Sequence, residues 1–173
     1  NSVSFLKRSG IKGPKDLEGK VFSTTKNDGT NLIFPIFAKA NNLDVSKIGL
    51  KHVASNLRDT LVMQGQADGT FGWATTAVMN MMAAGVKRQD TGYLAFSDYG
   101  VRLFSSGLQV RKDFADKHPD VVRGFVRATM KGIQDLVANP KVGIASVKKR
   151  DRRLDEKIEL IRYNLIRDVA LAT

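Results

Sequence analysis

The sequence contains no cysteine and only two histidines, His52 and His118. Without cysteine, the chain forms no disulfide, no thiolate metal site and no cysteine nucleophile. The two imidazoles lie 66 positions apart, so they do not form a local histidine pair of the kind that binds zinc. These absences argue against a metal enzyme, and we predict no cofactor, no metal and no catalytic residue.

Long apolar segments are also missing. No run approaches the roughly 18 residues that a membrane-spanning helix needs, since the richest stretch, residues 77–84, ends at Gly85. The first residues, Asn1-Ser2-Val3, carry neither the basic region nor the apolar region of an export signal. We therefore expect that a signal was removed or that the chain was cut further in.

Acidic residues are few, with 17 Asp and Glu against 28 Lys and Arg and a net charge of +11. Such an excess raises nucleic acid or an anionic surface as a partner. However, the charge is spread evenly, with 13 basic and 8 acidic residues up to position 110 and 15 and 9 after it. The one dense basic run, residues 148–153, has no aromatic side chains for stacking on bases. We interpret it as a solvated loop and predict no nucleic-acid partner, while a basic nucleic-acid binder stays a third alternative.

Short β-prone runs alternate with helical patterns over the first hundred residues. Strands are predicted over residues 20–25, 48–53 and 67–71, each followed by apolar residues at helical spacing. Alternation with short links predicts an α/β fold with a mainly parallel sheet flanked by helices. In such sheets, the loops at the carboxyl ends of the strands converge on a ligand crevice. Residues 24–31 and 72–76 are two such loops.

Helix start and stop signals set the expected boundaries. A helix is predicted from near Asn31, because Pro35 is tolerated only in a first turn. The next helix has Ser55 or Asn56 as its expected N-cap and Gly65 at its C-terminal end. A third is predicted to open at residues 75–76 and to end at residue 85.

Beyond a β-prone stretch over residues 101–110, interrupted at residues 105–107, the pattern is helical only. A helix is predicted from Pro119 to Asn139-Pro140, followed by a shorter one to about Lys149. Two apolar stripes result, one of Val122, Phe125, Val126, Thr129, Ile133, Leu136 and Val137, and one of Leu154, Ile158, Ile161, Leu165 and Val169.

Residues 11–20, IKGPKDLEGK, closely resemble the "I-x-x-P-x-DL-x-GK" motif that leads into the second lobe of periplasmic-type solute-binding proteins. Further landmarks follow in the same order. Residues 64–69 resemble the family's "GQVDA" strand start, Trp73 lies where the family often has Trp, and residues 117–123 resemble its "x-P-E-x-V-R" helix start. Together they resemble the NMT1-like branch, which binds nitrate, alkanesulfonates, taurine and thiamine-pyrimidine precursors.

The resemblance implies a type II periplasmic binding protein fold, of which this chain is a partial protein without most of the first lobe. In the family's layout, residues 1–18 are an incoming crossing segment, 19–100 the second α/β lobe, 101–110 a returning crossing segment and 111–173 the helical part of the first lobe. The helical stripes would pack on first-lobe strands. Without those strands, we predict a homodimer of this fragment through its C-terminal helices, or a first-lobe segment present only in the intact protein.

The function implied by the resemblance is that of the solute-binding component of an ABC-type importer, not an enzyme. Such a protein is exported to the periplasm, or lipid-anchored outside the cell. It captures a small organic molecule between two lobes and delivers it to a membrane permease. The solute is either a sulfonate, taurine or nitrate-like anion or a thiamine-pyrimidine-like heterocycle. A pyrimidine-precursor biosynthesis enzyme on the same scaffold remains the alternative function.

Candidate ligand-binding residues come from three loops. The loop 24–31 combines hydroxyls, an amide and backbone N–H groups at a helix N-terminus, which suits an anionic group, although turn formers are expected in any such loop. Trp73 follows a strand and either stacks on a flat ligand or packs in the core. Two polar residues at the crossing between lobes either contact ligand or serve the hinge. The predicted set is Thr24, Thr25, Asn27, Gly29, Thr30, Asn31, Trp73, Thr75, Asp98 and Tyr99.

Overall fold

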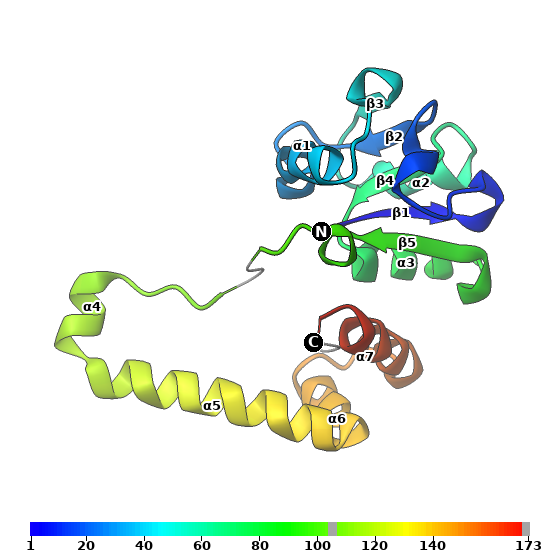
Figure 1. The fold of residues 1–173 in the computed structure, drawn as a ribbon. Coiled ribbons are helices and arrows are strands. Elements are labelled where there is room, and N and C mark those ends of the chain that lie inside the picture. Colours follow the sequence, from blue (N-terminus) through cyan, green and yellow to red (C-terminus); the bar gives the residue numbers. More distant parts are fainter. Residues whose placement is uncertain (104–106, 171–173) are drawn as a thin grey trace. The chain divides into compact units, whose positions relative to one another are not determined.

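A computed structural model describes residues 1–103 and 107–170. The chain divides into two compact units (Figure 1), Asn1–Leu103, here called the α/β unit, and Phe104–Thr173, here called the helical unit. The predicted crossing stretch 101–110 contains no helix or strand in its described residues, and residues 104–106 lie outside them.

The α/β unit contains a five-stranded sheet in the order β3-β2-β4-β1-β5. β2 pairs in parallel with β3 and β4, whereas β1 is antiparallel to both β4 and β5. Four strands therefore run in one direction and β1 runs against them, which makes the sheet mixed. The strands are β1 (Ser2–Leu6), β2 (Val21–Thr24), β3 (Gly49–His52), β4 (Gly69–Gly72) and β5 (Thr91–Ala95).

β1 was not predicted as a strand, because the sequence analysis identified residues 1–18 only as an incoming crossing segment. All five of its residues are buried, because the strand lies between β4 and β5 and has packed helices on both sides. Val3 and Phe5 belong to the core on one face of the sheet, and Leu6 belongs to the core on the other. Alternating side chains of one strand thus serve two cores.

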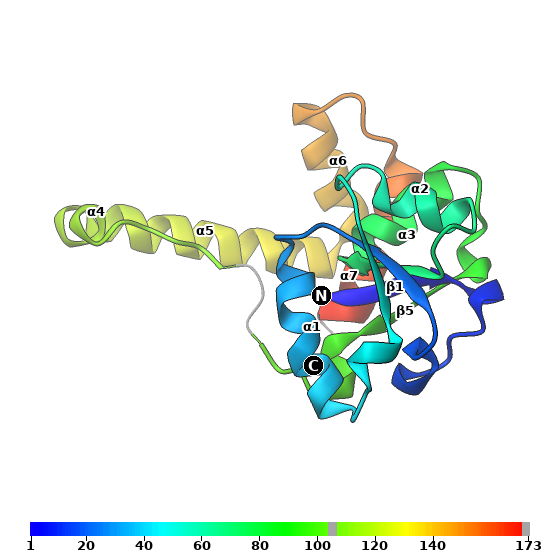
Figure 2. The ribbon, with the colours of Figure 1, turned by 90° about the horizontal axis from the view of Figure 1, so that it is seen from above.

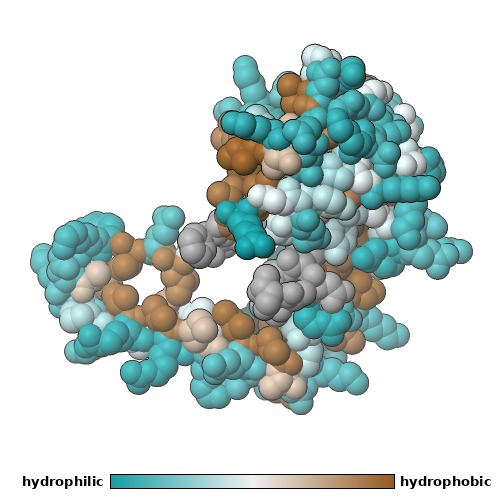
Figure 3. Space-filling model, in the orientation of Figure 1, coloured by the Kyte–Doolittle hydropathy of each residue, from teal (hydrophilic) through white to brown (hydrophobic). Residues whose placement is uncertain are grey.

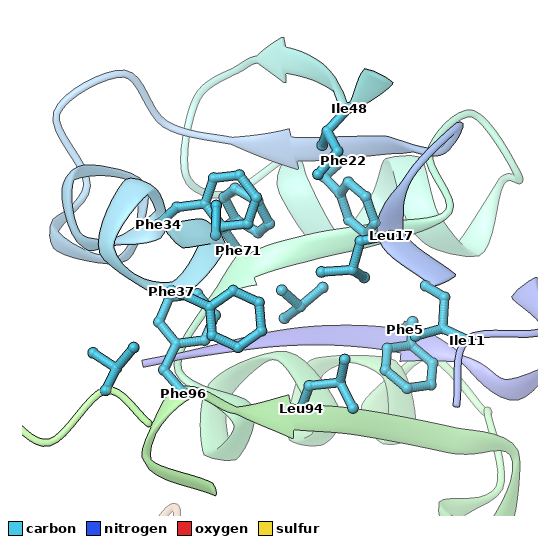
Figure 4. Packing of buried hydrophobic residues seen from close by; sticks show 13 residues of the cluster. Phe5, Ile11, Leu17, Phe22, Phe34, Phe37, Ile48, Phe71, Leu94 and Phe96 are labelled. Carbon is cyan, nitrogen blue, oxygen red and sulfur yellow. The ribbon is translucent and has the colours of Figure 1, made fainter. Parts of the chain in front are cut away.

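Helices cover both faces of this sheet, with α1 (Gly29–Ala40) on one face and α2 (Arg58–Met63) and α3 (Ala74–Ala83) on the other (Figures 1 and 2). The core under α1 is aromatic. The ring of Phe34 packs at a tilt against that of Phe71, with centroids 4.5 Å apart and 37° between their planes, and Figure 4 shows both rings between α1 and the sheet. The smaller core under α2 and α3 contains Val62 and Met81.

The helix boundaries differ from the prediction in two places. α1 begins at Gly29 with Asp28 as its N-cap, so Pro35 lies in the second turn and not in the first. The helix tolerates a proline there although proline cannot donate to the carbonyl four residues earlier. α2 is capped by Leu57, with no side-chain hydrogen bond, because it begins after the expected caps. Gly65 is left-handed at φ +72, as predicted.

In the segment 11–20, which carries the strongest resemblance, the structure explains three of the marked residues, Pro14, Asp16 and Leu17. Pro14 opens a 3-10 turn, Pro14–Leu17, and Oδ2 of Asp16 accepts hydrogen bonds from the N–H groups of Lys12 and Gly13 at 2.8 and 2.9 Å. Leu17 is fully buried. Because these hydrogen bonds stabilise the charged carboxylate, they hold the pKa of Asp16 below its ordinary value.

The helical unit contains α4 (Lys112–Lys117), α5 (Pro119–Ala138), α6 (Pro140–Arg150) and α7 (Glu156–Ala170). As predicted, Pro119 is the first residue of α5, and Asn139 both ends α5 and caps α6. The predicted stripe of α5 is largely exposed. Phe125 is 62% and Ile133 44% exposed, and Figure 3 shows hydrophobic surface along this helix. In the second stripe, Leu165 is buried, Ile158 is exposed, and the side chain of Val169 lies outside the described part.

None of the helices described in the two units is long and apolar enough to cross a lipid bilayer.

Candidate functional site

One edge of the sheet collects the candidate residues. β2 and β4 end there because they run in parallel, and β1 starts there because it is antiparallel, with Ser2 opposite Gly72. The hydroxyl of Ser2 donates to the carbonyl of Gly72 at 2.9 Å. The loops 24–31 and 72–76 therefore leave the sheet at the same edge, as the sequence predicts for strands of one direction.

Most polar side chains in the loop 24–31 are used to shape the loop. Thr25 donates its hydroxyl to the carbonyl of Val53 at 3.1 Å. Thr30 is buried and donates to the side-chain oxygen of Asn1 at 2.9 Å, and Asn31 donates its amide to the carbonyl of Lys26 at 3.1 Å. These hydrogen bonds account for three of the predicted ligand residues as loop structure.

Asp28 occupies the start of α1, because its Oδ1 accepts a hydrogen bond from the N–H of Thr30 at 2.9 Å. A carboxylate at this position satisfies a free N–H group and the positive end of the helix dipole. The predicted anion-binding helix end is thus already capped by the chain itself. Two predicted residues keep unused groups in this loop. Thr24 has a buried hydroxyl that finds no hydrogen-bond partner among the described residues, and Asn27 is exposed.

The second loop leads into α3, whose first turn is more open. Its N-cap residue is Trp73, and no side chain caps the helix. The carbonyl of Trp73 accepts from the N–H groups of Thr76 and Ala77 at 3.0 Å each, whereas those of Ala74 and Thr75 find no acceptor in the described part of the chain. Trp73 is 45% exposed, so its indole is available to a ligand and is not fully packed in the core.

Asp98 and Tyr99 belong to the 3-10 turn Phe96–Tyr99, which directly follows β5. The carbonyl of Tyr99 accepts from the side-chain amide of Asn41 at 3.0 Å, and Asn41 follows the last residue of α1. The loop 24–31 is at the other end of that helix, about 18 Å away along an axis of twelve residues. Asp98 is exposed beside Ser97. The carbonyl of Tyr99 therefore lies at the opposite end of α1 from the loop 24–31, whereas β5, which precedes Asp98, ends at the same edge of the sheet as β4, because Ser2 pairs with both Ala95 and Gly72.

Arg58 also lies at this edge of the sheet, and the sequence analysis did not identify it as a candidate. Its Nη1 donates to Oδ2 of Asp28 at 3.1 Å and to the carbonyl of Phe71 at 2.8 Å. Its side chain is only 14% exposed. A single arginine at the start of a short helix is normally solvated, so only the fold reveals that this one connects α1 to the end of β4.

A resident metal has no obvious site in the α/β unit or in the helical unit as described. No group of three or more His, Asp or Glu side chains gathers there in a way that would hold a metal ion.

Comparison with known proteins identifies the family. Residues 1–142 match the family described as NMT1/THI5 like. The taurine-binding periplasmic protein of Escherichia coli (strain K12) is 26% identical over 145 residues, which cover 82% of this chain and 43% of that protein. The family match includes the segments on which the resemblance rested, residues 11–20, 64–69 and 117–123.

Solved structures give the same fold. The periplasmic aliphatic sulphonate binding protein SsuA from Escherichia coli superposes with a TM-score of 0.72 at 14% identity, over 94% of this chain and 51% of that one. The alkanesulfonate-binding protein SsuA from Xanthomonas axonopodis pv. citri, bound to MOPS, gives a TM-score of 0.60 at 15% identity, over 95% and 54%. At these identities the likeness concerns the fold alone.

The chain spans about half the length of the relatives it matches. The predicted α/β periplasmic binding protein fold is confirmed by the superpositions, and the resemblance by the family match. Since that match covers more than half of the chain, the chain belongs to the NMT1/THI5-like family.

Proposed function

We propose that this chain is part of a non-catalytic solute-binding protein that captures an organosulfonate, such as taurine or an alkanesulfonate, for an ABC-type importer. The observation that carries the proposal is the sequence match to a taurine-binding periplasmic protein over 82% of the chain. The two sulfonate-binding structures that share the fold add support. The relatives are named as binding proteins, and we propose no reaction step.

The edge of the sheet has the chemistry that such a solute requires. A sulfonate accepts several hydrogen bonds, and the start of α3 provides N–H groups without acceptors beside the hydroxyl of Thr75. The indole of Trp73 provides an apolar surface for the solute's carbon chain. The loop residues Thr24 and Asn27 lie at the same edge. Gly29, Thr25, Thr30 and Asn31 would shape this wall through their backbone and internal hydrogen bonds.

We propose that the α/β unit is the second of two lobes and that the helical unit belongs to the first, whose strands lie outside this sequence. The two lobes would close on the solute by a hinge motion. The exposed apolar stripe of α5 supports this assignment, because an apolar face of this kind requires a covering partner. In the isolated chain, a second copy would cover it, giving a homodimer through the C-terminal helices.

The intact protein would act in the periplasm, free or lipid-anchored, and dock on a membrane permease after closure. Its relatives are named as periplasmic proteins, which supports this location.

The test is a thermal-shift screen of a protein that contains this chain together with the missing lobe. Taurine, ethanesulfonate, nitrate and a methylated aminopyrimidine are added one at a time. A ligand that binds only the native state raises stability by RT ln(1 + [L]/Kd), so we expect a higher unfolding temperature with the sulfonates. Stabilisation by the pyrimidine alone would transfer the protein to the heterocycle-binding group, and no stabilisation by any solute would contradict the proposal.

A further inference from the structure

The guanidinium of Arg58 is held in a fixed orientation at the proposed solute edge. Nη1 uses both of its hydrogens, one for Oδ2 of Asp28 and one for the carbonyl of Phe71. Asp28 is itself fixed, because its other oxygen caps α1 at Thr30. The guanidinium is therefore positioned by two elements before any ligand arrives, which is the arrangement that reduces the cost of ordering a binding group.

The rest of this guanidinium is unused. Nε is buried and has no hydrogen-bond partner, and Nη2 makes no hydrogen bond within the described residues. Nearly all buried polar groups in native proteins have a partner, so an unsatisfied donor of a charged group requires an explanation. Asp28 contacts only Nη1 of the guanidinium, so the N–H groups of Nε and Nη2 remain free, in the described part of the chain, to donate hydrogen bonds.

Glycine at position 72 lets the guanidinium lie close to the backbone at the end of β4. At Gly72, a Cβ atom would lie 3.4 Å from both Nη1 and Nη2, so a larger residue would place its side chain against the charged group. Because glycine has no side chain, position 72 adds no atoms over this face of the guanidinium, and the Arg58 side chain keeps 14% of its surface exposed. The next residue is the exposed Trp73, followed by the uncapped start of α3. The guanidinium of Arg58 thus lies beside the residue that precedes Trp73, at the start of the second loop.

A sulfonate or another oxyanion matches these donors. The guanidinium is planar and permanently charged, and it binds oxyanions through parallel hydrogen bonds that an ammonium cannot reproduce. A neutral solute would leave the charge compensated by Asp28 alone.

We propose that Arg58 is a specificity-determining residue that binds the oxyanion group of the solute through Nη2, with Asp28 and Phe71 as its positioning partners. The inference rests on the proposed solute-binding function and names the group that selects an anion.

The test compares Arg58→Met and Arg58→Lys with Arg8→Met in a protein that contains this chain and the missing lobe. Arg8 is a matched control, because its Nη2 also donates to a backbone carbonyl, that of Met63 at 2.9 Å, but it follows the opposite end of β1. Calorimetric titration with ethanesulfonate measures affinity, and thermal unfolding measures stability. We expect Arg58→Met to weaken binding by about 10- to 100-fold, as for loss of a charged hydrogen bond, and Arg8→Met by less than about twofold.

Arg58→Lys retains the charge and one donor toward Asp28 or the Phe71 carbonyl but has no second nitrogen. It should fold with a nearly unchanged unfolding temperature and still bind ethanesulfonate about tenfold more weakly. Wild-type affinity in Arg58→Lys or Arg58→Met would overturn this inference, and binding by those variants would leave the proposed function standing. If the unsubstituted protein binds a pyrimidine but no oxyanion, this inference fails and the proposed solute changes from an organosulfonate to a heterocycle, while a solute-binding role remains. If the unsubstituted protein binds no solute, both the proposed function and the inference about Arg58 fail.

Discussion

The rings of Phe37 and Phe96 stack with centroids 4.3 Å apart and an angle of 23° between their planes. This contact joins α1 to the segment that follows β5, and Figure 4 shows both rings within the same core. Phe37 is fully buried and Phe96 nearly so. The stack therefore connects α1, which begins within the loop 24–31, to the segment that follows β5.

Truncating this stack should destabilise the α/β unit. We expect Phe37→Ala to lower the free energy of unfolding by about 3–5 kcal/mol, because it removes buried area and leaves a cavity. Leu32→Ala on the same helix is the control. Leu32 is 67% exposed, so its removal should cost less than about 0.5 kcal/mol. Urea unfolding followed by circular dichroism measures both, and equal losses would contradict this account of the core.

Asp28 should contribute to stability through two separate contacts. Asp28→Ala removes the cap of α1 and the partner of Arg58, and we expect a loss of about 1–3 kcal/mol in the free energy of unfolding. Asp28→Asn keeps an oxygen for the cap and should lose less. Asp98→Ala, which removes an exposed carboxylate, is the control. A stability of Asp28→Ala equal to that of the control would rule out the proposed cap.

The contribution of Asp16 to the stability of the fold should depend on pH. Hydrogen bonds from Lys12 and Gly13 lower its pKa in the folded state, so its contribution is present above the ordinary value and is lost as pH falls through the lowered one. Asp16→Asn should therefore be less stable at about pH 7, and the difference should shrink toward about pH 2. Thermal unfolding across this range, with Asp98→Asn as control, measures it. A difference that grows in acid would contradict the sign.

Trp73 should report on the solute. Because its side chain is 45% exposed, we expect acrylamide to quench its fluorescence efficiently in the free protein. Ethanesulfonate should reduce the quenching and shift the emission if the indole lines the site. Trp73 is the single tryptophan, so no other indole contributes. Tight binding detected by calorimetry with unchanged quenching would remove Trp73 from the site.

The stripe of α5 should drive association of the isolated chain. Phe125, Val126, Ile133 and Val137 are each at least 43% exposed, and burying each such side chain is worth about 1.5 kcal/mol. We expect light scattering to give a mass above 19.0 kDa for the 173-residue chain. Phe125→Glu should lower it, whereas Gln134→Glu, with the same added charge on the same helix, should not. A monomer at all concentrations would contradict pairing through these helices.

Much of the local structure was predictable because it depends on neighbours in the chain. The alternation of strands and helices, the start of α5 at Pro119 and the left-handed Gly65 follow from periodicity, proline geometry and glycine's access to positive φ. The segment 11–20 carries its own hydrogen bonds, those of Asp16, so its sequence pattern is local too. These features required no knowledge of distant residues.

The candidate site was predictable only in part. The loop 24–31 was identified by its polar residues, but its internal hydrogen bonds involve residues from far along the chain, such as Val53 for Thr25. Tyr99 was predicted at the crossing between lobes, and its carbonyl lies next to Asn41 at the C-terminal end of α1. The sequence did not decide whether Trp73 packs in the core or is exposed to a ligand, because the sequence pattern around a tryptophan that follows a strand is the same in both cases.

The sequence by itself determined the family, the α/β class and the positions of most helices and strands, because periodicity and turn residues act over a few positions. Only the tertiary structure decided that β1 enters the sheet, since its partners Phe71 and Leu94 are far away in sequence. It also decided the environment of Arg58. That guanidinium is oriented by Asp28 and by the end of β4, 30 and 13 positions away, and contacts over such separations exist only once the chain has folded.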